Sequence, residues 1–564
     1  MSARFLVSGD SAVVVEFGNR VDRIVSEQVL ALSARVRSAA IDGVLETVPT
    51  YRSLMVLHDP LAIDTATLIA RLDSLLGASD AGATEARLWR LPACYDEAYA
   101  PDLADIAQRT GMTRAEVVRL HSEQTYHVYM LGFSPGFTYM GDLPQPLVLP
   151  RRTDPRVKVP AGSIAIATGQ TAIYPVESPG GWHLIGTTPV RLFDAQRQEP
   201  ALLRPGDKVK FEPISALQFE KIRASVIPPE AGIQNNVVPA HGAIHNDGFE
   251  VISAGPFTTV QDAGRSGYQD VGVPRSGPLD RVSYALANAL VGNGANAPCL
   301  EMLLQGVTLK VLADSVRVAL VGCGAGIEIK GENARRVPAG QSVRLARGEV
   351  LRVGALGDSV CAYLAIEGGI EVPAVLGSAS TYVRGAIGGV QGRRLQPKDR
   401  LLIARSSVDR RPERALAEPL ELGFDEPIRV VLGPQHDYFT AAAIETFLSS
   451  EYTVTPHADR MGYRLEGPQI GHQSGYDIVS DGIVTGAVQV PGSRQPIVLM
   501  VDNQTTGGYP KIATVISADI PLVARRRPGR KLRFVQVDVA EAGRARRAQE
   551  AALRHHIEAI RTID

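Results

Sequence analysis

A phrase that occurs twice is the feature of this chain that most constrains its fold. Residues 159–175 read VPAGSIAIATGQTAIYP, and residues 490–510 read VPGSRQPIVLMVDNQTTGGYP. Each copy contains Val-Pro, a Gly-Ser step, an apolar run, Gln-Thr and Tyr-Pro in the same order. Two ordered copies about 330 residues apart predict two related folding units, each of which builds half of one structure.

Composition narrows the class of protein. At ~150 residues per domain, the 564 residues allow about four domains. Glycine (54) and proline (37) lie between short apolar runs, which favours strands joined by tight turns. The net charge of −1 argues against a nucleic-acid partner, and four cysteines without a C-x-x-C pair predict neither a disulfide framework nor a zinc site. No apolar run reaches ~18 residues and no signal-peptide core is present, so we expect no membrane segment and a cytoplasmic protein.

The pattern along the chain predicts six segments. In order they are a small α/β domain, a domain mostly of strand and turn, a linker, two further strand-rich domains and a C-terminal amphipathic basic helix: 1–85, 86–222, 223–248, 249–425, 426–540 and 541–564. A charged stretch near 405–426 separates the two later β domains. The linker is poor in large apolar residues, which suggests a fusion of two ancestral proteins. Residues 5–17 alternate around a Gly-Asp turn and predict a hairpin. Helical periodicity marks 25–39, 67–76 and 283–293, the last ended by Gly292 and Asn293, and Thr113 with Glu116 predicts a capping box.

The second copy of the phrase ends in a turn with binding chemistry. Residues 502–516, DNQTTGGYPKIATVI, run from an apolar strand through a polar turn into another strand. Gly507 and Gly508 permit a ligand to approach the backbone closely, and Lys511 adds a positive charge. Such a turn can bind a small anion. The alternative is a β-hairpin with an exposed lysine and a solvated Asp502.

The first copy lies in a block rich in aromatic and basic residues, 127–186. GFSPGFTYM sets aromatic side chains around Gly and Pro, as the floor of a pocket would, and SPGGW places Trp182 on a Gly-rich turn. The alternative for the aromatic residues is an ordinary core. His127, between Tyr126 and Tyr129, is a candidate catalytic base, with a hydrogen-bonded core histidine as the alternative. The basic cluster before the phrase is a candidate anion site or a solvated loop: Arg151, Arg152, Arg156 and Lys158.

A third block, 255–280, is too polar and Gly-rich to be core. It therefore predicts a long loop over a scaffold, and such loops are disproportionately functional. A solvated connection without a ligand is the alternative. Its polar candidates are Gln261, Asp262, Arg265 and Asp280.

Taken together, these blocks resemble a known family. The 127–186 block resembles the B subunit of ATP-dependent 5-oxoprolinase, also described as allophanate hydrolase subunit 1 or the kinase-A-inhibitor family. The blocks 255–325 and 481–516 resemble the C subunit of the same enzyme, or allophanate hydrolase subunit 2. The chain looks like a B–C fusion, and both halves are similar to the carboxyltransferase region of urea carboxylase. Leu279 and His183 depart from the family pattern, where methionine and an amide are common.

The resemblance implies a mainly β protein with α+β parts, built from cyclophilin-like β-barrels and a small N-terminal α/β domain. It also implies opening of 5-oxo-L-proline to L-glutamate with ATP, expected together with Mg²⁺. The partner it implies is a separate chain that resembles the A subunit of 5-oxoprolinase. Phosphorylation of the lactam carbonyl oxygen would make that carbon electrophilic. The substrate is then a small amide, and homo-oligomerisation stays open.

Roles for single residues follow from this hypothesis. Lys511 and Arg265 hold phosphate or the substrate carboxylate, Asp262 or Asp502 binds a metal ion or accepts a proton, and His127 is a further catalytic candidate. The remaining candidates hydrogen-bond the amide, wall the pocket or bind substrate: Gln170, Thr171, Tyr174, Trp182, Asp280, Gln504, Thr505 and Tyr509.

Two other functions stay open. Biotin-dependent carboxyl transfer to urea or a similar amide would use the same groups. The chain shows no Met-Lys-Met biotin attachment site and no ATP-grasp glycine loop, so it would supply only the transferase part. The resemblance of the first half to the kinase-A-inhibitor family also permits a regulatory protein that inhibits a sensor kinase.

Overall fold

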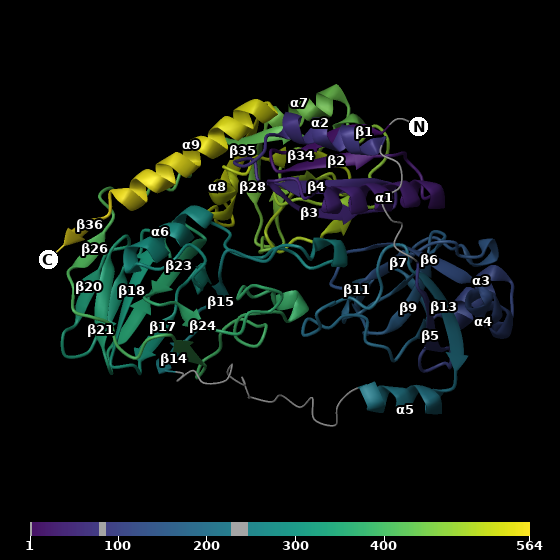
Figure 1. The fold of residues 1–564 in the computed structure, drawn as a ribbon, viewed down its shortest axis with the longest axis horizontal. Coiled ribbons are helices and arrows are strands. Elements are labelled where there is room, and N and C mark those ends of the chain that lie inside the picture. The colour runs from purple at the N-terminus through teal and green to yellow at the C-terminus, as the bar shows by residue number, and fades with distance from the viewer. Residues whose placement is uncertain (1–2, 78–85, 227–245, 564) are drawn as a thin grey trace.

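The computed structural model describes residues 3–77, 86–226 and 246–563 (Figure 1). Most of the predicted linker, positions 227–245, lies outside the described residues. Strands dominate the fold, and two closed seven-stranded barrels confirm the predicted mainly β class with cyclophilin-like barrels. Within the described ranges, no helix is long and apolar enough to cross a membrane.

The N-terminal unit is an antiparallel sheet covered on both faces. Its strand order is β1-β2-β4-β3, from Arg4–Ser8, Ala12–Glu16, Ser53–His58 and Val44–Pro49. Val13 and Val15 face helices α1 (Arg23–Ala39) and α2 (Thr65–Leu76), whereas Ala12 and Val14 face the second barrel. Period-2 alternation therefore buries both faces of β2, which explains why its apolar run is continuous.

The ends of the two helices follow from their caps. Asp22 accepts the backbone N–H groups of Ile24 and Val25, and Asp64 accepts that of Thr67. Each helix therefore begins two residues before its predicted start, because the capping aspartate directly precedes the first helical residue. The predicted capping box at Thr113 and Glu116 is confirmed at the start of α4 (Arg114–Glu123).

The first barrel, called barrel 1 below, has the strand order β10-β7-β6-β13-β5-β12-β9. Helices α3 (Leu103–Thr110) and α4 connect β5 to β6, and α5 (Ala216–Val226) follows the last strand. A two-stranded ribbon, β8 (Arg156–Val159) and β11 (Ser178–Gly180), extends from it. The barrel strands are β5 Leu88–Cys94, β6 Thr125–Leu131, β7 Thr138–Met140, β9 Ser163–Ala167, β10 Gln170–Ile173, β12 His183–Thr187 and β13 Lys208–Ile214.

The middle domain consists of a seven-stranded and a five-stranded sheet with a shared core. Helix α6 (Arg281–Val291) ends at Gly292 in the left-handed conformation, as the sequence predicts. The seven-stranded order is β20-β19-β22-β17-β14-β25-β24, from Arg335–Val337, Ile327–Lys330, Val350–Val353, Thr308–Val311, Asn246–Ser253, Arg400–Ile403 and Ile370–Glu371. The five-stranded order is β15-β16-β23-β18-β21, from Phe257–Gln261, Cys299–Leu303, Cys361–Ile366, Ser315–Val321 and Ser342–Ala346.

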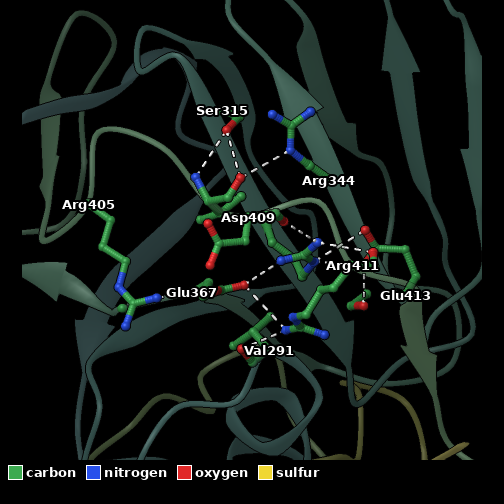
Figure 2. Close-up of polar contacts among 12 residues, drawn as sticks. Val291, Ser315, Arg344, Glu367, Arg405, Asp409, Arg411 and Glu413 are labelled. Carbon is green, nitrogen blue, oxygen red and sulfur yellow. Dashed lines mark hydrogen bonds and ion pairs between the residues drawn. The ribbon is translucent and has the colours of Figure 1, made fainter. Parts of the chain in front are cut away.

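The charged stretch near 405–426 is fastened to this domain by buried charge (Figure 2). Arg317 on β18, 0% exposed, pairs with Glu367 at 2.7 Å and with Glu413 at 3.0 Å. Its remaining Nη2 donates to the Asp409 carbonyl at 3.1 Å. One central guanidinium thus satisfies several acceptors of the segment, which accounts for its charged composition.

The second barrel, called barrel 2 below, has the order β27-β34-β31-β32-β29-β28-β35. Helices α7 (Ala441–Ser449) and α8 (Ile520–Ala524) lie between its strands in the chain, and a ribbon of β30 (Asp481–Gly482) and β33 (Thr506–Gly507) extends from it. The barrel strands are β27 Ile428–Leu432, β28 Glu451–Val454, β29 Gly462–Glu466, β31 Ala487–Gln489, β32 Ile497–Leu499, β34 Lys511–Val515 and β35 Lys531–Gln536.

The C-terminus differs in part from its prediction. Helix α9 spans Val539–Glu558 and packs on the surface through Ala542, Arg546 and Leu553. It does not continue to 564, because Arg561–Ile563 forms β36 and pairs with β26 (Glu413–Ala415). Figure 1 shows α9 running along the upper left edge of the molecule toward this small sheet.

The two barrels share one topology, which confirms the prediction of two related units. Around each barrel the strands follow the same order by their place in the chain, and the first and last strands pair in parallel. The two copies of the doubled phrase, however, do not lie at corresponding positions of the two barrels. Val159-Pro160 precedes the fourth barrel strand, β9, whereas Val490-Pro491 follows the fourth barrel strand, β31.

Strand pairing gives the true register. Thr187 pairs with Ser163 in barrel 1 as Thr514 pairs with Ala487 in barrel 2, and both ladders have a bulge one step further on. Gly180-Gly181-Trp182 therefore corresponds to Gly507-Gly508-Tyr509. The same register matches Leu184 to Lys511, Ala165 to Gln489 and Arg156 to Asp481.

Candidate functional site

The β3–β4 turn of the N-terminal sheet contacts both barrels. Tyr51 donates from its hydroxyl to Gln170 Oε1 of barrel 1 at 2.7 Å. Two residues later, Ser53 donates from Oγ to Asp481 Oδ1 of barrel 2 at 2.5 Å. Arg52, between them, is buried against Glu16. A single turn therefore links the polar groups of both barrels.

Lys511 and Asp481 form a buried ion pair in barrel 2. Lys511 begins β34 and donates from Nζ to Asp481 Oδ2 at 2.9 Å and to the Gly482 carbonyl at 3.2 Å. The two side chains are 0% and 1% exposed. Gln435 joins them, because its Nε2 donates to Asp481 Oδ2 at 3.1 Å and its Oε1 accepts the Lys511 backbone N–H at 3.3 Å.

The electrostatics of this pair are set by its neighbours. Burial by itself would raise the pKa of Asp481, because it disfavours the charged carboxylate. The positive charges of Lys511 and Arg52 and the hydrogen bond from Ser53 outweigh burial and lower the pKa to about 2. Asp481 is therefore a carboxylate at neutral pH and holds the Lys511 ammonium.

This arrangement changes the interpretation of the 502–511 turn. The alternative of an exposed lysine is wrong, because Lys511 is fully buried. Its ammonium already has a protein carboxylate as partner, so a ligand anion would have to compete with Asp481. Asp502 is not solvated either. It pairs with Arg460 Nε at 2.8 Å, and Arg460 also contacts Glu301.

Several buried polar atoms of the same turn have no partner among the described residues. They are the hydroxyls of Thr505 and Thr506 and the Oδ1 of Asn503, and the Nε2 of Gln489 on the neighbouring strand β31 is unpartnered in the same way. A Cβ at Gly507 would lie 2.9 Å from Gln504 Nε2 and 3.1 Å from Gln489 Nε2, so only glycine leaves room for both amides. Tyr509 is half-buried beside them in the chain. Unpaired buried donors are costly, which makes this turn a place where a polar ligand would be stabilised.

Barrel 1 contacts this turn directly. A Cβ at Gly132, in the predicted GFSPGF loop, would lie 2.0 Å from Thr506 Oγ1. The neighbouring residue Ser134 contacts Gly272 of the 255–280 loop through its carbonyl, where an added Cβ would lie 2.3 Å away. Three segments that the sequence singled out therefore meet at one junction.

The predicted aromatic residues of barrel 1 form one cluster. Phe137 packs against Tyr174 with ring centroids 4.9 Å apart, and Tyr139 packs against Trp182 at 6.1 Å. Tyr51 of the β3–β4 turn joins them at 6.0 Å from Tyr139. Burial raises the pKa of Tyr174 to about 12, although Arg151 and Arg156 act against it. Leu184, the counterpart of Lys511, belongs to this apolar cluster.

Two other predicted residues of barrel 1 make their polar contacts outside this cluster. Thr171 is buried, donates to the Ala165 carbonyl at 3.1 Å and contacts His121 Nε2 at 3.1 Å. His127 faces Ser26 of α1 at 3.4 Å. Burial, with Arg23 and Lys208 nearby, lowers the pKa of His127 to about 4. The environment of His127 is that of the core-histidine alternative.

The 255–280 block contains one buried cation with free donors. Arg265, 2% exposed, donates from Nη2 to the Ser380 carbonyl, while its Nε and Nη1 have no partner among the described residues. Burial lowers the pKa of Arg265, and the charges of Asp502 and Asp262 oppose that shift. These two free N–H directions fit an anionic oxygen.

The aspartates of this block are engaged in the fold. Asp262 accepts Ser378 Oγ at 2.5 Å and the Ala379 N–H at 2.6 Å. Asp280 caps α6 and pairs with Arg525 at 2.7 Å. Across residues 3–77, 86–226 and 246–563, no group of three or more His, Cys, Asp or Glu is placed to hold a metal ion. Asp262 and Asp502 are both engaged by groups of the fold, so a metal ion or a proton at either carboxylate would have to compete with those partners.

The sequence reasoning missed four residues of the site: Arg52, Ser53, Gln435 and Asp481. The first two lie in PTYRS and Asp481 in SDGIV, segments without a recognisable motif. The one signal for Asp481 is its position when the strands of the two barrels are aligned. The ribbon pairs Asp481 with Gly507 in barrel 2 as it pairs Arg156 with Gly180 in barrel 1.

Comparisons with known proteins follow the two halves of the chain. The family described as carboxyltransferase domain, subdomain C and D, matches residues 3–203, and that described as subdomain A and B matches 271–536. The C subunit of 5-oxoprolinase from Escherichia coli strain K12 is 39% identical over 302 residues, covering 54% of this chain and 95% of that protein. The B subunit of 5-oxoprolinase from Escherichia coli O157:H7 is 42% identical over 214 residues, covering 37% and 96%.

Other relatives contain the same domains in a larger protein. Urea amidolyase of Lachancea kluyveri is 33% identical over 331 residues, which is 54% of this chain but 18% of that protein. The crystal structure of TTHA0988 matches with a TM-score of 0.79 and 35% identity, covering 93% of this chain and 99% of that one. Urea amidolyase of K. lactis matches with a TM-score of 0.51 and 25% identity, over 71% and 26%.

The paired barrels and these matches define a protein built from carboxyltransferase subdomains. The chain belongs to the carboxyltransferase-domain family. Within that family it joins a counterpart of the B subunit of 5-oxoprolinase to a counterpart of the C subunit.

Proposed function

We propose that this chain is the fused B and C component of an ATP-dependent 5-oxoprolinase, which opens 5-oxo-L-proline to L-glutamate together with a chain that resembles the A subunit. One observation carries the proposal. The Lys511–Asp481 pair of the C-like half receives Ser53 and the Arg52 charge from the B-like half. A centre assembled by both halves explains why they are useful as one chain.

The chemistry asks for polar donors and positive charge. A five-membered lactam is a resonance-stabilised amide, so its carbonyl carbon is a poor electrophile. Ring opening adds a water oxygen to that carbon and a proton to the lactam nitrogen, and ATP hydrolysis drives it. The unpaired Gln489 amide and the Thr505 and Thr506 hydroxyls suit an amide-like substrate.

The phosphates of ATP require cations that are free to bind them. Arg265 fits this role, because two of its N–H groups have no partner among the described residues. Lys511 fits it less well, because its ammonium is held by Asp481. In the proposal Lys511 therefore positions the 502–511 turn, and Arg265 binds an anionic oxygen of phosphate or substrate.

The test measures ATP-dependent glutamate release from 5-oxoproline by the purified chain, with and without a chain that resembles the A subunit. We expect release only in the mixture, and a loss of at least about 100-fold with Arg265→Gln, since one well-placed electrostatic donor contributes on the order of that factor. Arg405→Gln, an exposed arginine of the middle domain, is the matched control. Near-normal turnover of Arg265→Gln would remove Arg265 from the mechanism, and release by the chain alone would contradict the partner.

A second function is favoured by one observation, the match to carboxyltransferase subdomains and to urea amidolyase. In that case the chain would transfer a carboxyl group from carboxybiotin to urea or a related amide. The discriminating measurement is biotin-dependent CO₂ exchange into urea. We expect none, and exchange at a rate above that of glutamate release would favour the second function.

A further inference from the structure

A cavity of about 340 Å³ opens where the N-terminal sheet meets barrel 2. This volume is within the range of about 300–1,000 Å³ that small-molecule sites occupy. Both halves of the chain build it. Its polar lining includes Arg4, Glu16, Asn19 and Arg52 from the B-like half and Gln435 and Asp437 from the C-like half.

The wall of this cavity carries two arginines and two carboxylates, Arg4, Arg52, Glu16 and Asp437, so its formal charges balance. Arg4 and Arg52 both pair with Glu16, Arg4 through Nη2 at 2.7 Å. Arg4 and Asp437 are exposed, where solvent screens their charges, whereas Arg52 and Glu16 are buried. Binding of an anion therefore depends on the buried guanidinium of Arg52.

Arg52 is the residue through which an anion would be held. Its side chain is 2% exposed, and its Nε is buried without a partner among the described residues. A buried charged donor left unpaired is costly, so an added acceptor would stabilise it. Its Nη1 is fixed by Glu16 and by the Gly18 carbonyl at 2.9 Å, which holds the guanidinium in place.

The cavity is directly coupled to the Lys511–Asp481 pair. Gln435 lines the cavity and donates to Asp481 Oδ2 at 3.1 Å. Arg52 lines the cavity and lowers the pKa of Asp481. Phe17 and Tyr438 add aromatic surface to the same wall. An occupant with an apolar ring and one acid group would match both kinds of surface.

We propose that this cavity binds a small carboxylic acid with a compact carbon skeleton, whose carboxylate pairs with Arg52 and Arg4. The choice of 5-oxoproline and glutamate as its ligands rests on the proposed function. The cavity itself is a separate site from the 502–511 turn, and it connects ligand binding in the B-like half to the ion pair in the C-like half.

Isothermal titration of the purified full chain tests the site without ATP and without a partner. The probes are 5-oxo-L-proline, L-glutamate, pyrrolidin-2-one, which lacks the carboxylate, and inorganic phosphate. We expect one of the two acids to bind at least 10-fold more tightly than pyrrolidin-2-one and phosphate. Equal binding of phosphate, or no binding of either acid up to millimolar concentration, would overturn the proposal.

A blocking variant locates the binding. Gly18 lines the cavity, has no positive φ, and an added Cβ meets no atom within 4 Å, so the side chain of Gly18→Phe begins in open space and is expected to occupy the cavity. Gly354→Phe in the middle domain meets the same two conditions and is the matched control. We expect at least a 10-fold loss of acid affinity in Gly18→Phe and none in Gly354→Phe. Arg4→Gln, which removes one of the two guanidinium groups proposed to pair with the carboxylate, should also weaken binding.

Unchanged affinity in Gly18→Phe places the acid elsewhere and overturns the assignment. This outcome is independent of ring opening, because neither ATP nor a second protein is present. Conversely, a chain that binds the acid in this cavity but never releases glutamate would contradict the proposed function and leave the site standing.

Discussion

Barrels 1 and 2 have the same strand order but opposite chemistry at matched positions. Where barrel 2 has Lys511 in an ion pair, barrel 1 has Leu184 in an aromatic cluster. Where barrel 2 has Asp481, barrel 1 has Arg156, which pairs with Asp102 at 2.6 Å. The comparison shows that the barrel backbone fixes where a side chain points, while the residue placed there decides whether the position is apolar core or a charged centre.

The largest expected effect breaks the charged centre of barrel 2. Lys511→Met leaves the Asp481 carboxylate buried without its cation, which should cost about 3–5 kcal/mol of folding free energy. Adding Asp481→Asn removes the second charge at similar shape and should recover most of that loss. Thermal and urea unfolding of both variants measure it. A double variant no more stable than Lys511→Met would show that the ion pair is not the cause.

The reciprocal change tests barrel 1. Leu184→Lys should destabilise the protein by roughly 3 kcal/mol or more, because it buries an ammonium in an apolar cluster where the register places Arg156, and not a carboxylate, at the position of Asp481. Leu184→Met, which keeps the volume, should cost less than about 1.5 kcal/mol. Comparable melting temperatures for the two variants would contradict the register between the barrels.

Acid should affect barrel 1 through its buried histidines. Burial lowers the pKa of His121 to about 3, and burial with Arg23 and Lys208 lowers that of His127 to about 4. In the unfolded chain both pKa values are near 6.5, so the unfolded state takes up protons first as pH falls. The stability present above pH ~6.5 is lost progressively down to the folded pKa values, by about 2 kcal/mol per histidine between pH 7 and 5.

Unfolding of the wild type and His127→Gln at pH 7 and 5 measures this difference. Between pH 7 and 5 the variant should lose about 2 kcal/mol less folding free energy than the wild type, which is the contribution of one histidine. Carboxylates titrate alike in both proteins and cancel. The same pH dependence in both would show that His127 is not held neutral by burial.

The smallest effects compare the two contacts of the β3–β4 turn. Ser53→Ala removes a hydrogen bond to a charged carboxylate and should cost about 1.5–3 kcal/mol, whereas Tyr51→Phe removes one to the neutral Gln170 and should cost about 0.5–1.5 kcal/mol. Urea unfolding of the single variants measures the two costs. A double-mutant cycle of Ser53→Ala with Asp481→Asn measures the coupling between these two side chains. Additivity in that cycle would contradict a direct Ser53–Asp481 bond.

Local structure was predictable from the sequence where residues close together in the chain determine it. The hairpin at residues 5–17, the capping box at Thr113 and the end of α6 at Gly292 all depend on neighbours in the chain. The correct alignment of the two repeated units was not predictable from the sequence. Val-Pro and Tyr-Pro recur by composition, whereas the true match, Gly180 to Gly507, appears only when the ladders are paired. Each barrel also has a β-bulge between its fourth and sixth strands, and the extra residue interrupts the two-residue alternation of side chains there.

The amino-acid sequence by itself determined the mainly β class, the two related units and the division into B-like and C-like halves, because periodicity, caps and family motifs are local properties of the chain. Only the tertiary structure decided that Lys511 is a buried partner of Asp481 rather than an exposed cation. Ser53, Gln435, Asp481 and Lys511 are far apart in the sequence. Gln435, Asp481 and Lys511 meet only when barrel 2 folds, and Ser53 reaches Asp481 only when the N-terminal sheet packs on that barrel.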